Sequence, residues 1–148
     1  MKNNLAALVG TWRGEGRGSY PTIDDFFYTE ELNFRDVGKP FLIYTQRTWS
    51  PSGDPMHVET GYLRPSGEFI IALPTGQAEC AQGEITTQPD GLHIELESEV
   101  LNTKTAKPVT GIQRIYRLLG DVLDCEIKMS TPDVGMTTHL ISRLIRQP

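Results

Sequence analysis

Apolar and polar residues alternate along most of the chain between residues 10 and 147, in short segments separated by turns. Successive side chains of a β-strand point to opposite faces, so such alternation indicates half-buried strands. Phe26, Tyr28, Glu30, Leu32 and Phe34, for example, fall on one face of a predicted strand. The spacing of these segments predicts about ten strands and leaves little room for a long helix.

Turn dipeptides connect the predicted strands. The strands cover residues 26–34, 41–49, 56–64, 68–73, 79–87, 92–101, 110–119, 122–130 and 139–146, after a first strand that begins at Gly10. Asp90-Gly91 and Gly120-Asp121 are typical of hairpins, in which neighbouring strands pair antiparallel. A sheet of this many strands tends to close. We therefore predict an all-β fold, a closed antiparallel barrel in one domain over residues 1–148, with short helical turns at residues 1–8 and 20–25.

The first predicted strand carries small residues and one large one on a single face. Gly10, Trp12, Gly14 and Gly16 alternate along it. A glycine removes the side chain from its face, so that backbone or another group can approach closely. This pattern suggests a strand that closes a small barrel, with the indole of Trp12 filling one end.

Composition narrows the possible functions. The 148 residues are 38% apolar and 22% charged, as in a soluble globular protein. The formal net charge of -5 argues against nucleic acid as a partner. No apolar run approaches the roughly 20 residues that span a membrane. Two cysteines, Cys80 and Cys125, are too few for a disulfide framework and predict reduced, mostly buried thiols in a cytoplasmic protein.

Three histidines are candidate ligands. His57 and His93 follow turns, so we expect them to be exposed. His139 lies in a stretch without charged residues, from Val134 to Ser142. A neutral imidazole that faces an apolar lumen is a good axial ligand for haem iron. The alternative is a buried histidine hydrogen-bonded to a backbone carbonyl, and the residue pattern alone leaves both possibilities open.

The carboxylates do not identify an acid/base pair. Glu30 and Glu31, and likewise Glu95, Glu97 and Glu99, are expected on solvated strand faces. The sequence contains no Gly-x-Ser-x-Gly elbow, no phosphate-binding Gly-x-x-x-x-Gly-Lys loop, no Cys-x-x-Cys and no Cys/His cluster with zinc spacing. A binding module is therefore the default interpretation.

Several motifs resemble those of a known family. Gly10-Thr11-Trp12-Arg13-Gly14-Glu15-Gly16, followed by Tyr20-Pro21-Thr22-Ile23, is similar to the Gly-x-Trp-x-Gly-x-Gly region of the nitrobindins. Further matches are residues 38–42, 46–49, 59–64 and 106–107. The resemblance covers nearly the whole chain. It implies a ten-stranded antiparallel β-barrel, similar in shape to lipocalins and fatty-acid-binding proteins, that binds b-type haem.

The resemblance also implies a site and an activity. His139 would be the axial iron ligand, with Thr22 and Lys107 as further haem contacts and one haem b per chain. Nitrobindins interact with nitric oxide in the ferrous state and convert peroxynitrite to nitrate in the ferric state, with no catalytic residue beyond the iron. Nitric oxide and peroxynitrite are thus the expected small-molecule partners, and a homodimer is compatible with this reading. The alternative is a non-catalytic carrier of a small apolar ligand.

Overall fold

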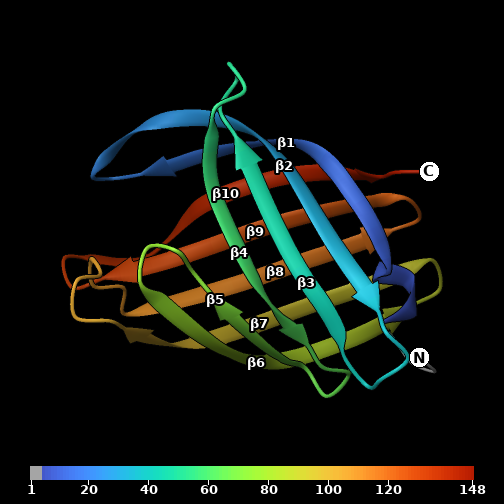
Figure 1. The fold of residues 1–148 in the computed structure, drawn as a ribbon. Coiled ribbons are helices and arrows are strands. Elements are labelled where there is room, and N and C mark those ends of the chain that lie inside the picture. The colour runs from blue at the N-terminus through green and yellow to red at the C-terminus, as the bar shows by residue number, and fades with distance from the viewer. Residues whose placement is uncertain (1–4) are drawn as a thin grey trace.

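The computed structural model describes residues 5–148, which form a closed barrel of ten antiparallel strands (Figure 1). The elements are a short 3₁₀ helix, η1 (Ala6–Leu8), and strands β1 (Gly10–Tyr20), β2 (Ile23–Asp36), β3 (Leu42–Trp49), β4 (Pro55–Leu63), β5 (Glu68–Ala72), β6 (Gln77–Gln88), β7 (Gly91–Asn102), β8 (Gly111–Leu119), β9 (Val122–Thr131) and β10 (Val134–Arg146). Each strand pairs with the next, and β10 pairs with β1. The predicted closed antiparallel barrel is confirmed. Within the described residues, no helix is both long and apolar enough to cross a membrane.

The predicted helical turn at residues 20–25 is wrong. β1 and β2 continue through this segment, because Tyr20 pairs with Ile23 across a two-residue turn. Pairing between the two strands thereby gives hydrogen-bond partners to backbone groups that would stay unpaired at the ends of a separate helical turn. At the N-terminus, η1 falls within the predicted helical turn at residues 1–8, of which residues 1–4 lie outside the described part of the chain.

The last strand is longer than predicted. It begins at Val134 rather than at His139, because Val134 pairs with Thr131 of β9 across the turn formed by Pro132 and Asp133. This pairing places His139 inside a strand and not at its start. The environment of His139 is therefore set by two neighbouring strands.

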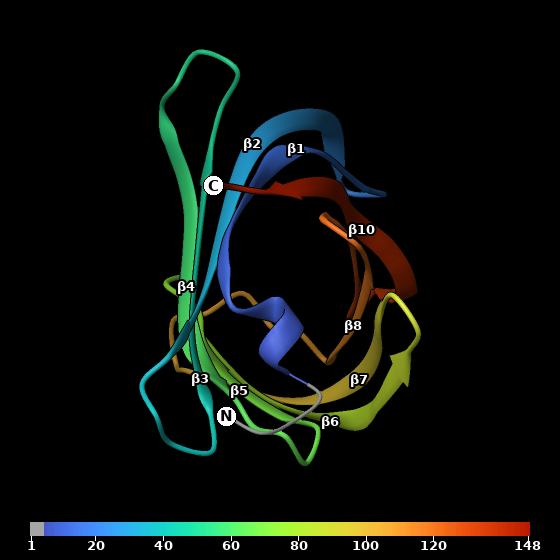
Figure 2. The same ribbon diagram turned by 90° about the vertical axis from the view of Figure 1, so that its right-hand side faces the viewer.

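One end of the barrel is filled, and we call it the closed end. There η1 lies across the opening (Figure 2), and Trp12 is fully buried beneath it. The indole Nε1 of Trp12 donates to the carbonyl oxygen of Leu8 at 2.9 Å. The guanidinium of Arg146 lies 4.2 Å from the indole centroid and donates to the carbonyls of Val9 and Ala7 at 2.8 and 2.6 Å. Trp12 therefore fills one end of the barrel, as its glycine-rich context predicts.

The apolar core occupies the closed half of the barrel. Along the inward face of β2, Phe26 and Tyr28 precede Glu30, and Leu32 and Phe34 follow it into the core. The core consists of Leu5, Leu8, Trp12, Leu32, Phe34, Leu42, Tyr44, Leu63, Phe69, Ile71, Ala81, Leu92, Ile94, Leu96, Tyr116, Leu118, Leu123, Cys125 and Leu144. The inward face of β2 thus runs from the apolar core, through the polar residue Glu30, to the aromatic residues Tyr28 and Phe26 nearer the other end of the barrel.

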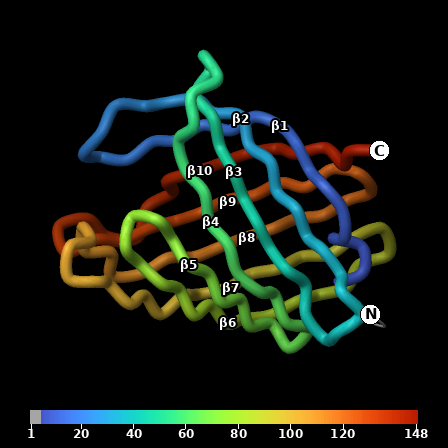
Figure 3. The backbone as a smooth tube through the Cα atoms, in the orientation of Figure 1, coloured from blue at the N-terminus to red at the C-terminus, as the bar shows by residue number. Residues whose placement is uncertain are grey.

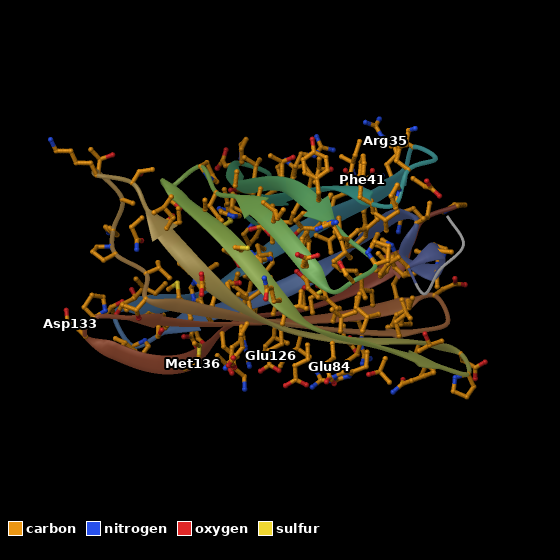
Figure 4. The ribbon with its side chains drawn as sticks, turned by 90° about the horizontal axis from the view of Figure 1, so that it is seen from below. Arg35, Phe41, Glu84, Glu126, Asp133 and Met136 are labelled. Atoms are coloured by element: carbon orange, nitrogen blue, oxygen red, sulfur yellow. The ribbon has the colours of Figure 1, made fainter. Side chains whose placement is uncertain are left out.

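The other end, which we call the open end, carries the turns that leave β1, β3, β5, β7 and β9 (Figures 1 and 3). Asp133, in the turn between β9 and β10, lies there, whereas Arg35 and Phe41 lie at the opposite end (Figure 4). The connection from β7 to β8 is tied to β9, because the backbone N–H of Thr110 donates to the carbonyl of Ser130 at 2.9 Å. These turns frame the entrance to the interior.

The glycines of β1 make room for neighbouring groups. A Cβ atom at Gly14 would lie 1.9 Å from a backbone carbonyl oxygen of β10. At Gly16 it would lie 2.3 Å from the ring of Tyr28, and at Gly18 it would lie 2.1 Å from the ring of Phe26. The missing side chains therefore let β10 approach and let two aromatic rings of β2 lie over β1.

We expect Gly14→Ala to lower the free energy of unfolding by about 2 kcal/mol or more, because the new methyl group would overlap rigid backbone. Urea-induced unfolding followed by tryptophan fluorescence measures this loss. Gly135→Ala is the matched control, since a Cβ atom there meets nothing within 4 Å. Equal stability of the two variants would contradict the close packing of β1 against β10.

Candidate functional site

A cavity of about 680 Å³ reaches from the open end into the barrel, a volume typical of small-molecule sites. Its outer part is largely apolar and includes Ile23, Phe26, Ile127, Met129 and Leu140. Its inner end is polar and includes Glu30, Gln46, Glu59 and Arg114. The cavity thus has two chemically different parts.

His139 enters the wall of this cavity through a β-bulge. The residues on either side of it, Thr138 and Leu140, pair with consecutive residues of β9, so His139 is an extra residue in β10. Regular alternation would place His139 on the outer face with Ile141, which is exposed. Because of the bulge, both His139 and Leu140 line the cavity.

The imidazole of His139 is held in one orientation and one tautomer. Its Nδ1 lies 3.0 Å from the carbonyl oxygen of Ser19. A carbonyl only accepts hydrogen bonds, so Nδ1 carries a proton, and in the neutral imidazole Nε2 is the nitrogen with the free lone pair. The rings of Tyr20 and Phe26 meet the imidazole edge-on, with centroids 5.1 and 6.3 Å away. The hydroxyl of Tyr20 in turn donates to the carbonyl of Met129 at 3.0 Å.

The structure brings Thr22 and Lys107 to the same opening as His139. All three line the cavity, and Thr22 and Lys107 are exposed at its rim. Thr22 lies in the turn between β1 and β2. Lys107 lies in the connection between β7 and β8, where its carbonyl accepts from Nε2 of Gln77 at 2.9 Å. Residues from three distant parts of the sequence therefore share one entrance.

The glycine motif has a different position. Gly10, Trp12, Gly14 and Gly16 do not line this cavity. They lie on β1 behind it, where they set the closed end and the approach of the neighbouring strands. Their contribution to the site is therefore the shape of the wall and not contact with a ligand.

A buried ionic cluster forms the inner end. Nη1 of Arg114 donates to Oε2 of Glu59 at 2.8 Å, and Nε donates to Oε1 of Glu79 at 2.8 Å, while Nη2 donates to the other Glu79 oxygen. The hydroxyl of Tyr44 also donates to Glu59, at 2.7 Å, and that of Tyr116 accepts from Arg114 at 3.1 Å. Buried charges persist only when they are paired in this way. With two carboxylates and one guanidinium, the cluster has an excess of negative charge.

The surroundings of the buried carboxyl groups change their pKa values in opposite directions. Burial by itself raises the pKa of Glu59, but the charge of Arg114 and the hydrogen bond from His57 outweigh it, and the pKa falls to about 2. Burial also raises the pKa of Glu30, and there the hydrogen bonds from Ser142 and Gln46 offset it only in part.

One of the sequence-based expectations about the carboxylates needs correction. Glu30 is not solvated: it is 7% exposed and points into the barrel, because it belongs to the inward, largely aromatic face of β2. Glu31, on the other face, does meet solvent and pairs with Arg13 and Arg47, each at 2.6 Å. Glu95, Glu97 and Glu99 are exposed, as expected.

The histidine and cysteine expectations also change. The side chains of His57 and His93 are only 29% and 30% exposed. Nε2 of His57 lies 3.0 Å from Oε1 of Glu59, and the ring lines the cavity. Cys125 is buried as expected, but Cys80 is exposed because it lies on the outward face of β6.

Sequence reasoning missed Gln46, His57, Glu59 and Arg114 as cavity residues. A signal was present, since Arg114 shares its strand phase with apolar neighbours that face the interior. A lone charge in an apolar phase indicates a buried, paired group. Its partners come from β4 and β6, which the sequence of β8 does not identify.

The fold and the cavity define a class of protein: a closed β-barrel that binds a small molecule, with a histidine at the mouth. The chain belongs to the family described as "THAP4-like, heme-binding beta-barrel domain", whose profile matches residues 2–146. The resemblance to the nitrobindins is thereby confirmed.

Individual relatives cover almost the whole chain. A protein of Nocardia farcinica named peroxynitrite isomerase is 43% identical over 96% of this chain and 88% of its own length. Peroxynitrite isomerase 1 of Rhodococcus jostii is 44% identical over 96% of this chain and 82% of its own length. The crystal structure of Rv2717c from M. tuberculosis matches with a TM-score of 0.94 and 40% identity, over 97% of this chain and 95% of that one.

The residues at the mouth fit a haem group. His139 offers a neutral ring nitrogen, and its other nitrogen donates to a carbonyl, as is usual for metal-ligating histidines. The apolar outer wall suits a porphyrin face. Within residues 5–148 no three His, Cys, Asp or Glu side chains gather around a possible metal position. Iron at His139 would therefore need a group that supplies its own equatorial ligands, as a porphyrin does.

We expect Arg114→Met to lower the free energy of unfolding by about 3 kcal/mol or more, because it leaves two carboxylates buried without the guanidinium that pairs with both of them. Urea-induced unfolding at neutral pH measures the loss. Adding Glu59→Gln and Glu79→Gln to this variant removes the unpaired charges and should restore most of the stability. A single variant as stable as the parent would contradict the role of the cluster.

The lowered pKa of Glu59 predicts a pH dependence of stability. The folded state favours the ionised carboxylate, so its contribution is full above the ordinary value of 4.5 and is lost as the pH falls towards about 2. The free energy of unfolding measured between pH 6 and pH 3 should fall less steeply in Glu59→Gln than in the parent. Glu99→Gln, an exposed control, should keep the parent's slope; equal slopes in all three proteins would contradict the assignment.

Proposed function

We propose that this protein binds one haem b per chain through Nε2 of His139 and isomerises peroxynitrite to nitrate. The observation that carries the proposal is the bulge that places His139 in the cavity wall with its Nδ1 donating to Ser19. Membership of a haem-binding family supports it, as do relatives that are named peroxynitrite isomerases.

The chain's own residues would bind and orient the group. His139 would supply the axial nitrogen, and its contacts with Ser19, Tyr20 and Phe26 would fix the plane of the imidazole. Apolar side chains of the outer cavity would exclude water from the porphyrin face. At the rim, the ammonium of Lys107 would offset the charge of the haem carboxylates, and the hydroxyl of Thr22 would offer a hydrogen bond.

A bound ferric haem supplies the iron chemistry of peroxynitrite isomerisation, whereas the protein supplies ligation, orientation and access. No side chain of this chain is assigned a catalytic role in the proposal. Its resemblance to the nitrobindins also supports nitric oxide as a ligand of the ferrous form. The free cysteines support a cytoplasmic location. Exposed Phe27 and Ile141 on the outer face would provide apolar contacts for a homodimer.

A non-catalytic carrier of a small apolar ligand is the second candidate function. The size of the cavity and the apolar outer wall favour it, and a fold of this kind serves both functions. The two candidates differ in what they need from His139, because a carrier needs no iron ligand.

We expect titration of the purified protein with hemin to give a sharp Soret band that saturates at one haem per chain. His139→Ala should lose this band, because the other histidine that lines the cavity, His57, is held by Glu59. His93→Ala is the control, since His93 lies on the outer side beside Glu95 and should leave the band unchanged. The haem-loaded parent is then assayed for nitrate formation from peroxynitrite. A broad, non-saturating band that is indifferent to His139→Ala would favour the carrier.

A further inference from the structure

The inner end of the cavity contains an acceptor without a donor. Within residues 5–148, Oε1 of Gln46 is the one buried side-chain nitrogen or oxygen atom that has no hydrogen-bond partner. Gln46 is 5% exposed and lines the cavity. Buried polar groups are almost always paired, so an unpaired one that faces a cavity points to a missing ligand.

The orientation of the Gln46 amide follows from its neighbour. Nε2 of Gln46 donates to Oε2 of Glu30 at 2.9 Å, and the hydroxyl of Ser142 donates to Oε1 of the same carboxylate. A carboxylate that accepts on both oxygens requires the amide nitrogen, and not the amide oxygen, to face it. The amide oxygen is therefore left for another donor.

The charges nearby disfavour an anion. Each nitrogen of the Arg114 guanidinium is engaged, since Nη1 bonds to Glu59 and Tyr116, and Nε and Nη2 bond to Glu79. A ligand carboxylate would meet Glu30 and Glu59, and the other basic side chain at this end, His57, is already bonded to Glu59. The inner end thus offers acceptors and an excess of negative charge.

We propose that the inner end of the cavity is a binding subsite for a primary ammonium group, carried on a short apolar body that lies in the outer cavity. The ammonium donates to Oε1 of Gln46, and its positive charge favours the ionised form of the neighbouring Glu30 carboxyl group, which burial by itself disfavours. Glu30 follows Phe26, near the mouth, by four positions along β2, a span of about 13 Å in a strand. An alkyl or aryl body of that length bridges the two parts. The subsite does not depend on haem ligation by His139.

The test compares three ligands that share one chain: octylammonium, 1-octanol and octanoate. Isothermal titration calorimetry uses the full-length protein without added haem at neutral pH. We expect octylammonium to bind about tenfold or more tightly than octanoate, with octanol between them, because charge-assisted hydrogen bonds are the stronger ones. Glu30→Gln and Gln46→Leu should each weaken octylammonium binding about tenfold.

The control substitution lies one residue away. Glu31→Gln changes the same residue type on the outer face of β2, where Glu31 pairs with Arg13 and Arg47, and should leave octylammonium binding unchanged. If Glu30→Gln does not fold, the test passes to Gln46→Leu and to the side-chain amide signals of Gln46 in nuclear magnetic resonance spectra of the parent. These signals should shift with octylammonium and not with octanoate.

The proposal is overturned if octanoate binds as tightly as octylammonium, or if all three ligands bind equally and only their chains matter. It is also overturned if the folded Gln46→Leu variant binds octylammonium like the parent. Because these titrations contain no haem, they are independent of the hemin titration of His139→Ala. Failure of either proposal therefore leaves the other one testable.

Discussion

The pairing of the first strand with the last is the constraint on which the rest of the structure depends. β1 and β10 close the barrel, and they can approach because Gly14 presents no side chain to the backbone of β10. The same face of β1 lets the rings of Phe26 and Tyr28 lie over Gly18 and Gly16. Closure therefore determines both the shape of the cavity wall and the position of the residues that line it.

Closure of the barrel also fixes the orientation of His139, the candidate haem ligand. The end of β1 brings the carbonyl of Ser19 beside β10, where it accepts from Nδ1 of His139. This contact requires the bulge between Thr138 and Leu140, because regular pairing would turn the imidazole to the outside. The bulge in the pairing of β10 with β9 thus places His139 in the wall of the cavity.

The interior combines an apolar outer cavity with a buried ionic cluster. Arg114 satisfies Glu59 and Glu79, and this pairing makes an inner end with excess negative charge possible inside a barrel. A haem at the mouth and the apolar body of the amine would both use the outer cavity, whereas the ammonium would lie at the inner end near Gln46. The two proposals therefore differ in chemistry and are tested separately.

Alternation and turn residues were sufficient to predict ten antiparallel strands and a barrel, because strand phase and hairpin turns are local properties. The sequence also singled out Trp12 and His139, and it placed Glu30 on the same face of β2 as Phe26 and Phe34, although it predicted a solvated position for Glu30. It did not show that Glu30 is buried, that His139 sits in a bulge or that Arg114 pairs across the barrel. Those features depend on register between strands that are distant in the chain, and only the closed tertiary structure determines that register.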